Sequence, residues 1–130
     1  MEASGRMSLW LKVTGTIYSL GAVDFLLRPR GATASLSRAG GGEPLDEEPS
    51  GLYNSLSAAY MATIAVLALG AAGSPHERKA LIPPLLVAKA SSSAALLWRF
   101  TQTRRRGFAV GAALDAFLLG VTAGLYNSLD

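Results

Sequence analysis

LYNSLSAAYMATIAVLALGAA occupies residues Leu52–Ala72 and carries no charged side chain. From Ala62 to Ala72 every side chain is apolar or small, so a helix over these residues has no polar face. A helix on the surface of a soluble domain normally shows an apolar stripe opposite a polar face. The segment also has about the 20 residues that a helix needs to cross about 30 Å of hydrocarbon. It therefore predicts a transmembrane helix.

Three further segments have similar length and character, at Leu9–Leu27, Ala80–Trp98 and Phe108–Tyr126. None shows the alternation of a membrane-crossing strand. Pro83 and Pro84 fall in the first turn of the third segment, where a missing N–H costs least. The connections favour antiparallel neighbours. We predict an all-α fold, a four-transmembrane-helix up-down bundle that forms one integral membrane domain over residues 1–130, with helices at about 9–27, 52–72, 80–98 and 108–126.

The connection at residues 28–50 is rich in Gly, Pro, Ser and acidic residues, and we expect a mobile polar loop there. Leu36 and Leu45 are its only large apolar residues. Residues Met1–Ser8 read as a short polar tail.

Two alternatives to four spans fit the sequence less well. The first segment could be a signal peptide cleaved after Ala32-Thr33-Ala34, but Arg28, Arg30 and Asp24 fit that pattern poorly. The chain could also be a soluble helical bundle, and the missing polar face of Leu52–Ala72 argues against this.

The hexapeptide GLYNSL occurs twice, at Gly51–Leu56 and Gly124–Leu129. The first copy opens the second segment and the second copy closes the fourth, so an internal duplication would align a helix start with a helix end. A shared physical need explains the two copies better. Tyr53 and Tyr126 suit the headgroup level, and the Asn and Ser that follow can satisfy frayed backbone groups.

The amino-acid composition excludes several kinds of functional site. The chain has no Cys and one His, which excludes disulfides, thiolate metal sites and a histidine-built metal site within one chain. We expect no cofactor and no catalytic residue. Only 16% of the residues are charged, against about 25% in soluble domains. No aromatic residue interleaves the Arg104–Arg106 run, so we expect no nucleic-acid partner; the expected partner is the lipid bilayer.

The basic residues predict an orientation. The side expected in the cytoplasm carries more of them than the opposite side, which puts both termini outside. The localisation that follows is the plasma (bacterial inner) membrane. The cytoplasmic set is Arg28, Arg30, Arg38, Arg99, Arg104, Arg105 and Arg106, and the opposite set is Arg6, Lys12, Arg78 and Lys79.

Ionisable side chains inside the segments mark a candidate site. Asp24, Lys89 and Asp115 each cost about 2.5–3.5 kcal/mol near mid-helix, and we expect all three nearer the Arg104 face. Lys89 and Asp115 lie on the two helices of one hairpin and can form a buried ion pair. We expect Asp24, Ser92 and Ser93 close to it. The pair can be purely structural, or the five residues can bind a small amphipathic ligand such as a quinone or a lipid. Asp24 can instead pair locally with Arg28, four residues later.

Small residues recur at every fourth position of the last segment, at Ala112, Ala116, Gly120 and Gly124. Such a stripe lets another helix approach closely. Ala58, Ala62 and Ala65 offer a small face on the second segment. We expect a tight bundle within one chain, with a homodimer through the last segment, or another membrane-protein partner, as the alternative.

The layout resembles the small four-helix membrane proteins of the DoxX-like superfamily. The resemblance rests on WLKVTGTIYSLGAVDFLLRP at Trp10–Pro29, the polar loop, the link GAAGSPHERK at Gly70–Lys79 and the internal acid Asp115. It implies a quinone-facing role, since some members are associated with quinol or thiosulfate oxidation. The residues themselves favour a non-catalytic accessory or structural module. The alternative is a binder or carrier of a quinone or lipid, and an enzyme is disfavoured because no catalytic constellation is present.

Overall fold

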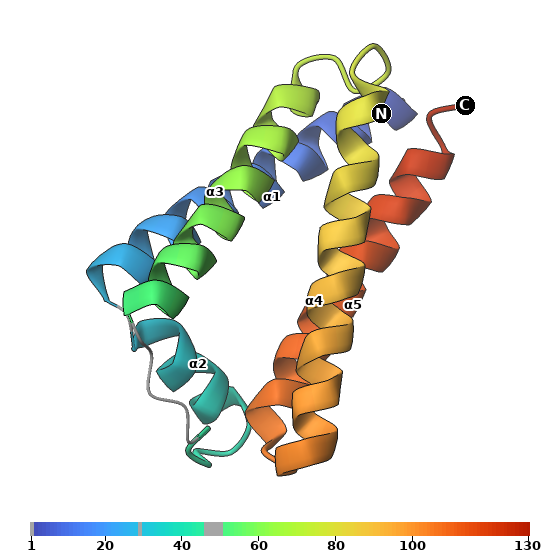
Figure 1. Ribbon diagram of the computed structural model, residues 1–130. Coiled ribbons are helices and arrows are strands. Elements are labelled where there is room, and N and C mark those ends of the chain that lie inside the picture. Colours follow the sequence, from blue (N-terminus) through green and yellow to red (C-terminus); the bar gives the residue numbers. More distant parts are fainter. Residues whose placement is uncertain (1, 29, 46–50) are drawn as a thin grey trace.

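The computed structural model describes residues 2–28, 30–45 and 51–130, with the backbone alone for residues 32 and 51–54. These residues form helices and no strand, so the all-α prediction is confirmed for the described part of the chain. Figure 1 shows the elements in order. They are α1 (Ala3–Leu27), α2 (Gly31–Ala39), α3 (Gly51–Ala72), the single 3₁₀ turn η1 (Lys79–Leu81), α4 (Ile82–Thr103) and α5 (Arg106–Asn127).

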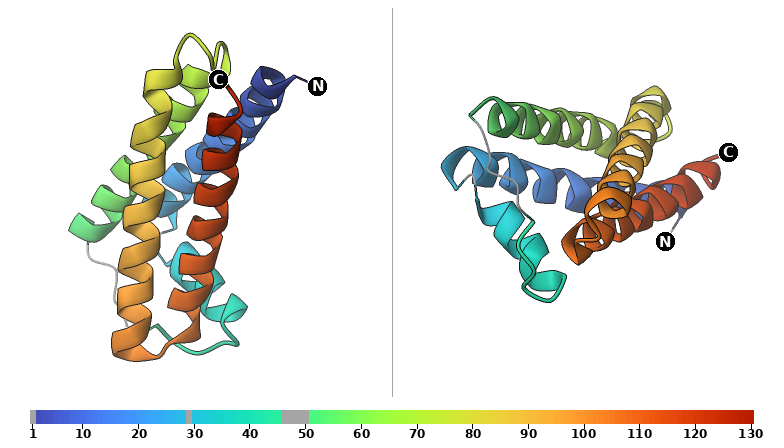
Figure 2. Two further views of the ribbon diagram at one scale, coloured as in Figure 1. Left: turned by 90° about the vertical axis from the view of Figure 1, so that its right-hand side faces the viewer. Right: turned by 60° about the horizontal axis from the view of Figure 1, so that its bottom comes forward.

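The long helices form two pairs of antiparallel neighbours. α1 packs along α3, and α4 packs along α5 (Figures 1 and 2). The pairs converge at the end that holds residue 2, residue 130 and the link between α3 and α4. They diverge toward the other end, where α2 connects them. Successive long helices therefore run up and down, as the lengths of the connections predict.

Three helices in the described part are long and apolar enough to cross a membrane. They are α3 over Ser55–Ala72, η1 with α4 over Lys79–Thr103, and α5 over Arg106–Asn127. α1 is the longest helix at 25 residues. Lys12 and Asp24 interrupt its apolar sequence, which lowers its hydropathy.

The core lies where the two helix pairs converge. Small side chains bring α1 and α3 together: a Cβ at Gly15 would lie 2.5 Å from Cγ of Leu69. On α3, Ala58 and Ala65 are buried, as the predicted small face requires, but Ala62 is exposed. The buried cluster consists of Met7, Leu11, Tyr18, Ile64, Ala65, Ala68, Ala71, Ala72, Ile82, Leu85 and Leu129.

The polar tail predicted at Met1–Ser8 is wrong from residue 3 onward, because α1 begins at Ala3. Met7 is fully buried in the core. The Ser8 hydroxyl donates a hydrogen bond of 2.5 Å to the Ala72 carbonyl at the end of α3. Tertiary contacts therefore extend the helix beyond its apolar run, and hydropathy alone does not show them.

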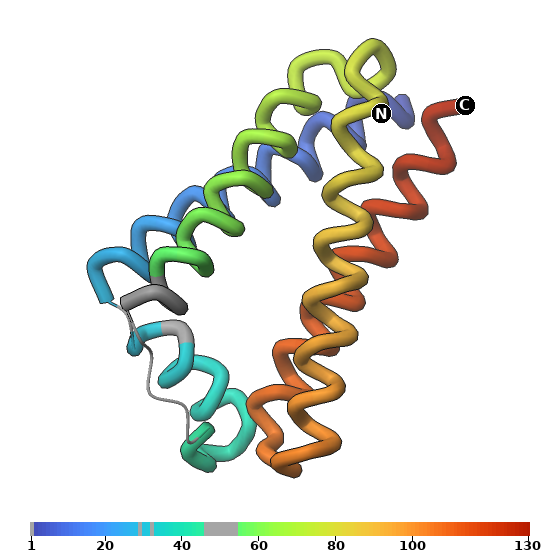
Figure 3. Tube along the Cα trace, in the orientation of Figure 1, coloured from blue at the N-terminus to red at the C-terminus, as the bar shows by residue number. Residues whose placement is uncertain are grey.

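The connection predicted as a mobile polar loop at 28–50 contains a helix. α2 occupies residues 31–39, as the trace in Figure 3 shows, and residues 46–50 lie outside the described part. Leu45 is buried, and its Cδ2 lies 2.7 Å from where a Cβ on Gly107 would be. Leu36 Cδ2 lies 3.6 Å from where a Cβ on Gly111 would be. The two leucines of this polar connection therefore pack against the start of α5.

α4 and α5 extend beyond their predicted bounds. α4 continues past Trp98 to Thr103 and ends at Arg104, which adopts the left-handed conformation with φ 57°. Pro83 and Pro84 lie in the first turn of α4, as predicted. The first GLYNSL copy opens α3 and the second spans the end of α5, at opposite ends of the molecule (Figure 1). Their role at the headgroup level stays a prediction.

Candidate functional site

Lys89 and Asp115 form the ion pair that the sequence predicts. Lys89 lies on α4 and is only 5% exposed. Its Nζ lies 3.0 Å from Oδ1 of Asp115 on α5. The carboxylate side chain is 13% exposed. A buried charge with an opposite charge at hydrogen-bond distance is the arrangement expected of ionisable groups inside a membrane.

The two serines of the predicted site lie next to this pair. Ser92 follows Lys89 by three residues and so shares its face of α4. Its hydroxyl donates to Oδ2 of Asp115. Ser93 donates instead to the Ala112 carbonyl of α5, at 2.9 Å. Ser92 therefore donates to the carboxylate, whereas the Ser93 side chain links α4 to the backbone of α5.

Two tyrosines complete the site, and neither was predicted from the sequence. Lys89 Nζ donates to the Tyr18 hydroxyl of α1 and lies 4.2 Å from the centre of the Tyr18 ring. The Tyr60 ring of α3 lies 5.6 Å from the same nitrogen. The Tyr60 hydroxyl donates to the Ala88 carbonyl at 3.0 Å. The sequence does carry a signal for them, since both tyrosines lie far from the ends of their apolar segments. A tyrosine hydroxyl buried at such a position needs a hydrogen-bond partner.

Asp24 does not join this cluster. Its carboxylate pairs with Arg28, with Oδ1 2.7 Å from Nε and 2.5 Å from Nη2. This local i,i+4 ion pair is sufficient to explain why an acidic residue occurs in the apolar sequence of α1. Figure 1 places the end of α1, where the pair lies, away from α4 and α5. The prediction that Asp24 lies with Lys89 is therefore wrong.

Along its helix, Lys89 does not lie nearer the Arg104 turn, as was predicted, and its depth in a membrane stays a prediction. Lys89 lies closer to Ile82, the first residue of α4, than to Thr103, the last. The reason is that α4 continues past Trp98, so the Arg104 turn is further away than the apolar run indicates.

A second polar contact joins the helix pairs closer to the chain ends. The Trp10 indole N–H donates to the Thr122 hydroxyl at 2.9 Å, and Thr122 donates to its own Leu118 carbonyl. The Trp10 ring also meets Phe117 edge-on at 6.5 Å. The buried Thr14 hydroxyl, one turn after Trp10, has no hydrogen-bond partner. One turn before Thr14, Trp10 contacts α5 through Thr122. One turn after it, Tyr18 contacts α4 through Lys89.

The cluster brings all four long helices into contact. Tyr18 comes from α1, Tyr60 from α3, Lys89 and Ser92 from α4 and Asp115 from α5. The ammonium group has a carboxylate, a hydroxyl and two aromatic faces around it. Each of these contacts is strengthened by the low dielectric of the interior. The positive charge of Lys89 is therefore stabilised by side chains of the same chain.

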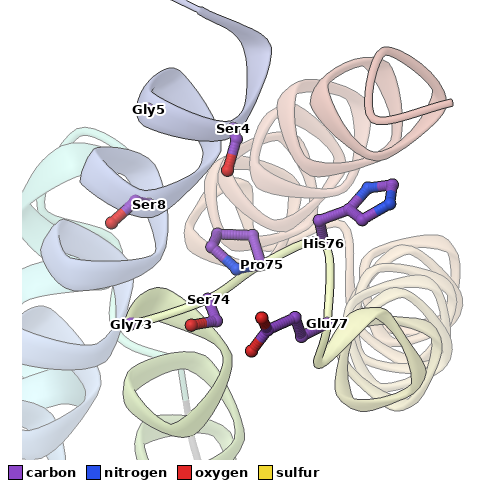
Figure 4. A pocket seen from close by; sticks show the side chains of 8 residues that line it. All are labelled: Ser4, Gly5, Ser8, Gly73, Ser74, Pro75, His76 and Glu77. Carbon is purple, nitrogen blue, oxygen red and sulfur yellow. The ribbon is translucent and has the colours of Figure 1, made fainter.

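A separate pocket of about 360 Å³ lies at the end where the helix pairs converge. Ser4, Gly5 and Ser8 of α1 line one side, and residues 73–77 of the α3–α4 link line the other (Figure 4). The His76 ring points away from Ser8 in this view, and its Nδ1 lies 3.2 Å from the Leu129 carbonyl oxygen. The pocket contains none of the predicted site residues.

The last residues of the chain are tied to this end. Lys79 contacts the Asp130 carboxylate and lies 4.9 Å from the centre of the Tyr126 ring. The Lys79 ammonium holds the pKa of Asp130 below its usual value. Any stability from this exposed pair is present at neutral pH and is lost as the pH falls through that lowered pKa.

Within the described ranges, no group of three or more His, Cys, Asp or Glu side chains could hold a metal ion. No family model, curated protein or solved structure matches the chain.

Proposed function

We propose that this chain is a non-catalytic accessory or structural module of the plasma (bacterial inner) membrane, with four spans held together by the Lys89–Asp115 pair. One observation carries the proposal. Lys89 is buried, and its charge is compensated by Asp115, Tyr18 and Tyr60 of the same chain. Buried polar networks whose members are satisfied serve to rigidify and specify a packing arrangement.

The outer surface of α1 supports the fourth span. Seven large apolar side chains on this helix are at least 45% exposed, and most follow one another at spacings of three and four. Helical residues at those spacings share a face. A soluble protein rarely exposes so continuous an apolar surface, whereas a lipid-facing helix requires one. The residues are Leu9, Val13, Ile17, Leu20, Val23, Leu26 and Leu27.

Lys12 lies within this surface and is exposed. It comes early in α1, near the end of the bundle that holds Arg78 and Lys79. A lysine at such a depth can extend its charged end to the interface while its methylenes stay in the apolar region. Its presence is therefore compatible with a membrane span.

The orientation follows from the arginines. The end of the molecule that holds α2 and the α4–α5 turn carries Arg38 and Arg104–Arg106. Cytoplasmic ends of membrane proteins are enriched in such residues, so we assign this end to the cytoplasm.

The DoxX-like relationship is part of the same proposal. Four long helices in up-and-down order support it, with α1 ending at Leu27 and an acid, Asp115, inside α5. The quinone-facing role that the resemblance implies has less support, because Asp24 lies apart from the Lys89 cluster and the lysine already has its partners in the chain.

Extraction of the purified protein tests the structural role against ligand binding. The protein is isolated in mild detergent, and quinones and lipids are quantified by mass spectrometry beside Lys89→Met. The structural role predicts no quinone at stoichiometric amounts in either sample. One quinone or lipid per chain that is lost in Lys89→Met would favour a ligand-binding site instead.

The exposed side of α5 supports a homodimer. Ala113, Ala116, Gly120 and Gly124 are exposed, and a Cβ at Gly120 or Gly124 would meet nothing within 4 Å. Only Ala112 of the predicted small stripe is buried within the chain. Close packing inside the chain uses Gly107 and Gly111 instead. The second half of the stripe is therefore available to a helix of another copy.

Gly120→Leu tests this dimer. The leucine has room in the single chain but separates two α5 helices in close contact, so energy transfer between labelled copies in vesicles should fall by more than half. Ala90→Leu, at an exposed small position of α4, is the matched control and should pair like the parent. Equal energy transfer in Gly120→Leu and the control contradicts pairing through α5.

A further inference from the structure

Five arginines gather where α2, α4 and α5 meet. Gly40, just after α2, packs on the start of α5, since its Cβ would lie 2.4 Å from the Gly107 nitrogen. Arg99 near the end of α4 lies 5.8 Å from the centre of the Phe108 ring of α5. These contacts bring three helix ends to one level. We call the arginines there the arginine corner: Arg38, Arg99, Arg104, Arg105 and Arg106.

Positive charge dominates among the described residues of this corner. Glu43 is the acid that the structure places there, and its Oε2 accepts a hydrogen bond of 3.3 Å from the Arg106 backbone N–H. Asp24 lies before α2 and is paired with Arg28. Asp46, Glu47 and Glu48 lie outside the described ranges. Arg38, Arg104 and Arg106 are exposed.

An apolar surface adjoins the corner on α4. Leu97 is 53% exposed and Trp98 is 65% exposed. Both residues lie in the last two turns of α4, which ends at Thr103 immediately before Arg104. A cationic helix end next to exposed apolar side chains has the two chemical halves of a phospholipid site, one for the headgroup and one for the acyl chains.

Cations at both ends of the molecule make contacts within the chain. Arg78 donates to the Gly70 carbonyl at 2.7 Å and Lys79 contacts Asp130, while the Arg104 guanidinium lies 6.0 Å from the centre of the Phe100 ring. The arginine corner is distinguished by its five arginines beside Leu97 and Trp98. We therefore propose that the arginine corner binds the headgroup of an anionic phospholipid, whose acyl chains lie along Leu97 and Trp98. This inference rests on the proposed membrane location of the chain.

Fluorescence of Trp98 tests the proposal. The chain has two tryptophans, so Trp10→Phe leaves Trp98 as the sole reporter. The protein is reconstituted in vesicles of brominated phosphatidylcholine, to which brominated phosphatidylglycerol is added in steps. A favourable contact between one arginine and an anionic surface corresponds to a preference of about fivefold. We expect quenching to show a preference for phosphatidylglycerol of about this size.

Two triple variants separate local from general charge effects. Arg38→Gln/Arg104→Gln/Arg106→Gln should abolish the preference, whereas Arg6→Gln/Arg78→Gln/Lys79→Gln at the other end should keep it. If the first variant fails to fold, 0.5 M NaCl should lower the preference in the parent protein. Equal quenching by both lipids, or an unchanged preference in the arginine-corner variant, overturns the lipid site alone. If neither lipid quenches Trp98, the membrane location fails as well.

Discussion

For Lys89, the sequence predicts one partner but not the other side chains around it. Its pairing with Asp115 was predictable, because both residues lie inside apolar segments of one hairpin and a charge in hydrocarbon needs a partner. Tyr18 and Tyr60 were not, because they reach Lys89 from the other helix pair. How two pairs pack against each other depends on side-chain fit over their whole length, and no local spacing encodes it.

Removal of Lys89 should cost more than removal of the whole ion pair. Lys89→Met leaves the Asp115 carboxylate buried with Ser92 as its remaining donor, and breaking such a pair costs about 3–5 kcal/mol. Lys89→Met/Asp115→Ala removes the orphaned charge and should recover at least about 1 kcal/mol. Unfolding by SDS in mixed micelles measures both changes.

Lys12→Met is the matched control for this pair of variants. Lys12 is exposed on α1, so its replacement should change the stability little. If the double variant is no more stable than Lys89→Met, the two residues are not coupled, and the structural role proposed for the pair is wrong.

Among the elements, helix type was easier to predict than helix ends. The apolar runs gave α3, α4 and α5 because their length and composition are sufficient for a membrane span. α1 begins before its apolar run, because Met7 and Ser8 are fixed by contacts with the rest of the protein. α2 was missed because its composition is that of a loop. Leu36 within it and Leu45 after it are the large apolar residues of this connection, and both pack on the start of α5.

Gly40→Ala should loosen α2 from α5. The added methyl group would lie 2.4 Å from the Gly107 nitrogen and 2.9 Å from the Arg106 carbonyl carbon, and backbone atoms cannot move aside cheaply. Overpacking of this kind costs about 1–3 kcal/mol. Hydrogen exchange at the α2 amides should accelerate by at least tenfold.

Gly73→Ala provides the comparison for Gly40→Ala, since a Cβ at Gly73 meets nothing within 4 Å. Its exchange rates in α2 should equal those of the parent. Slow exchange retained in Gly40→Ala means that α2 does not depend on this close contact with α5.

At the scale of the whole molecule, the up-and-down order of the long helices follows from the connections between them, but the divergence of the two helix pairs does not. The pairs meet through small residues and polar contacts near one end, and α2 lies between their other ends. The large exposed apolar side chains on all four long helices then form the outer surface, and a lipid environment explains that surface.

Spin labels on single cysteines test the membrane account most directly, since the chain has no native cysteine. The labels are placed in vesicles at four exposed positions, one on each long helix: Leu20, Val66, Val87 and Phe117. A fifth label at Gly42, exposed in the α2–α3 connection, serves as the aqueous control.

Collisions with dissolved oxygen and with a water-soluble nickel chelate distinguish hydrocarbon from water. The account predicts high oxygen and low nickel accessibility at the four helix positions, Leu20 of α1 included, and the reverse at Gly42. Nickel accessibility at Leu20 equal to that at Gly42 would remove α1 from the membrane, and the same result at all four positions would contradict the membrane account itself.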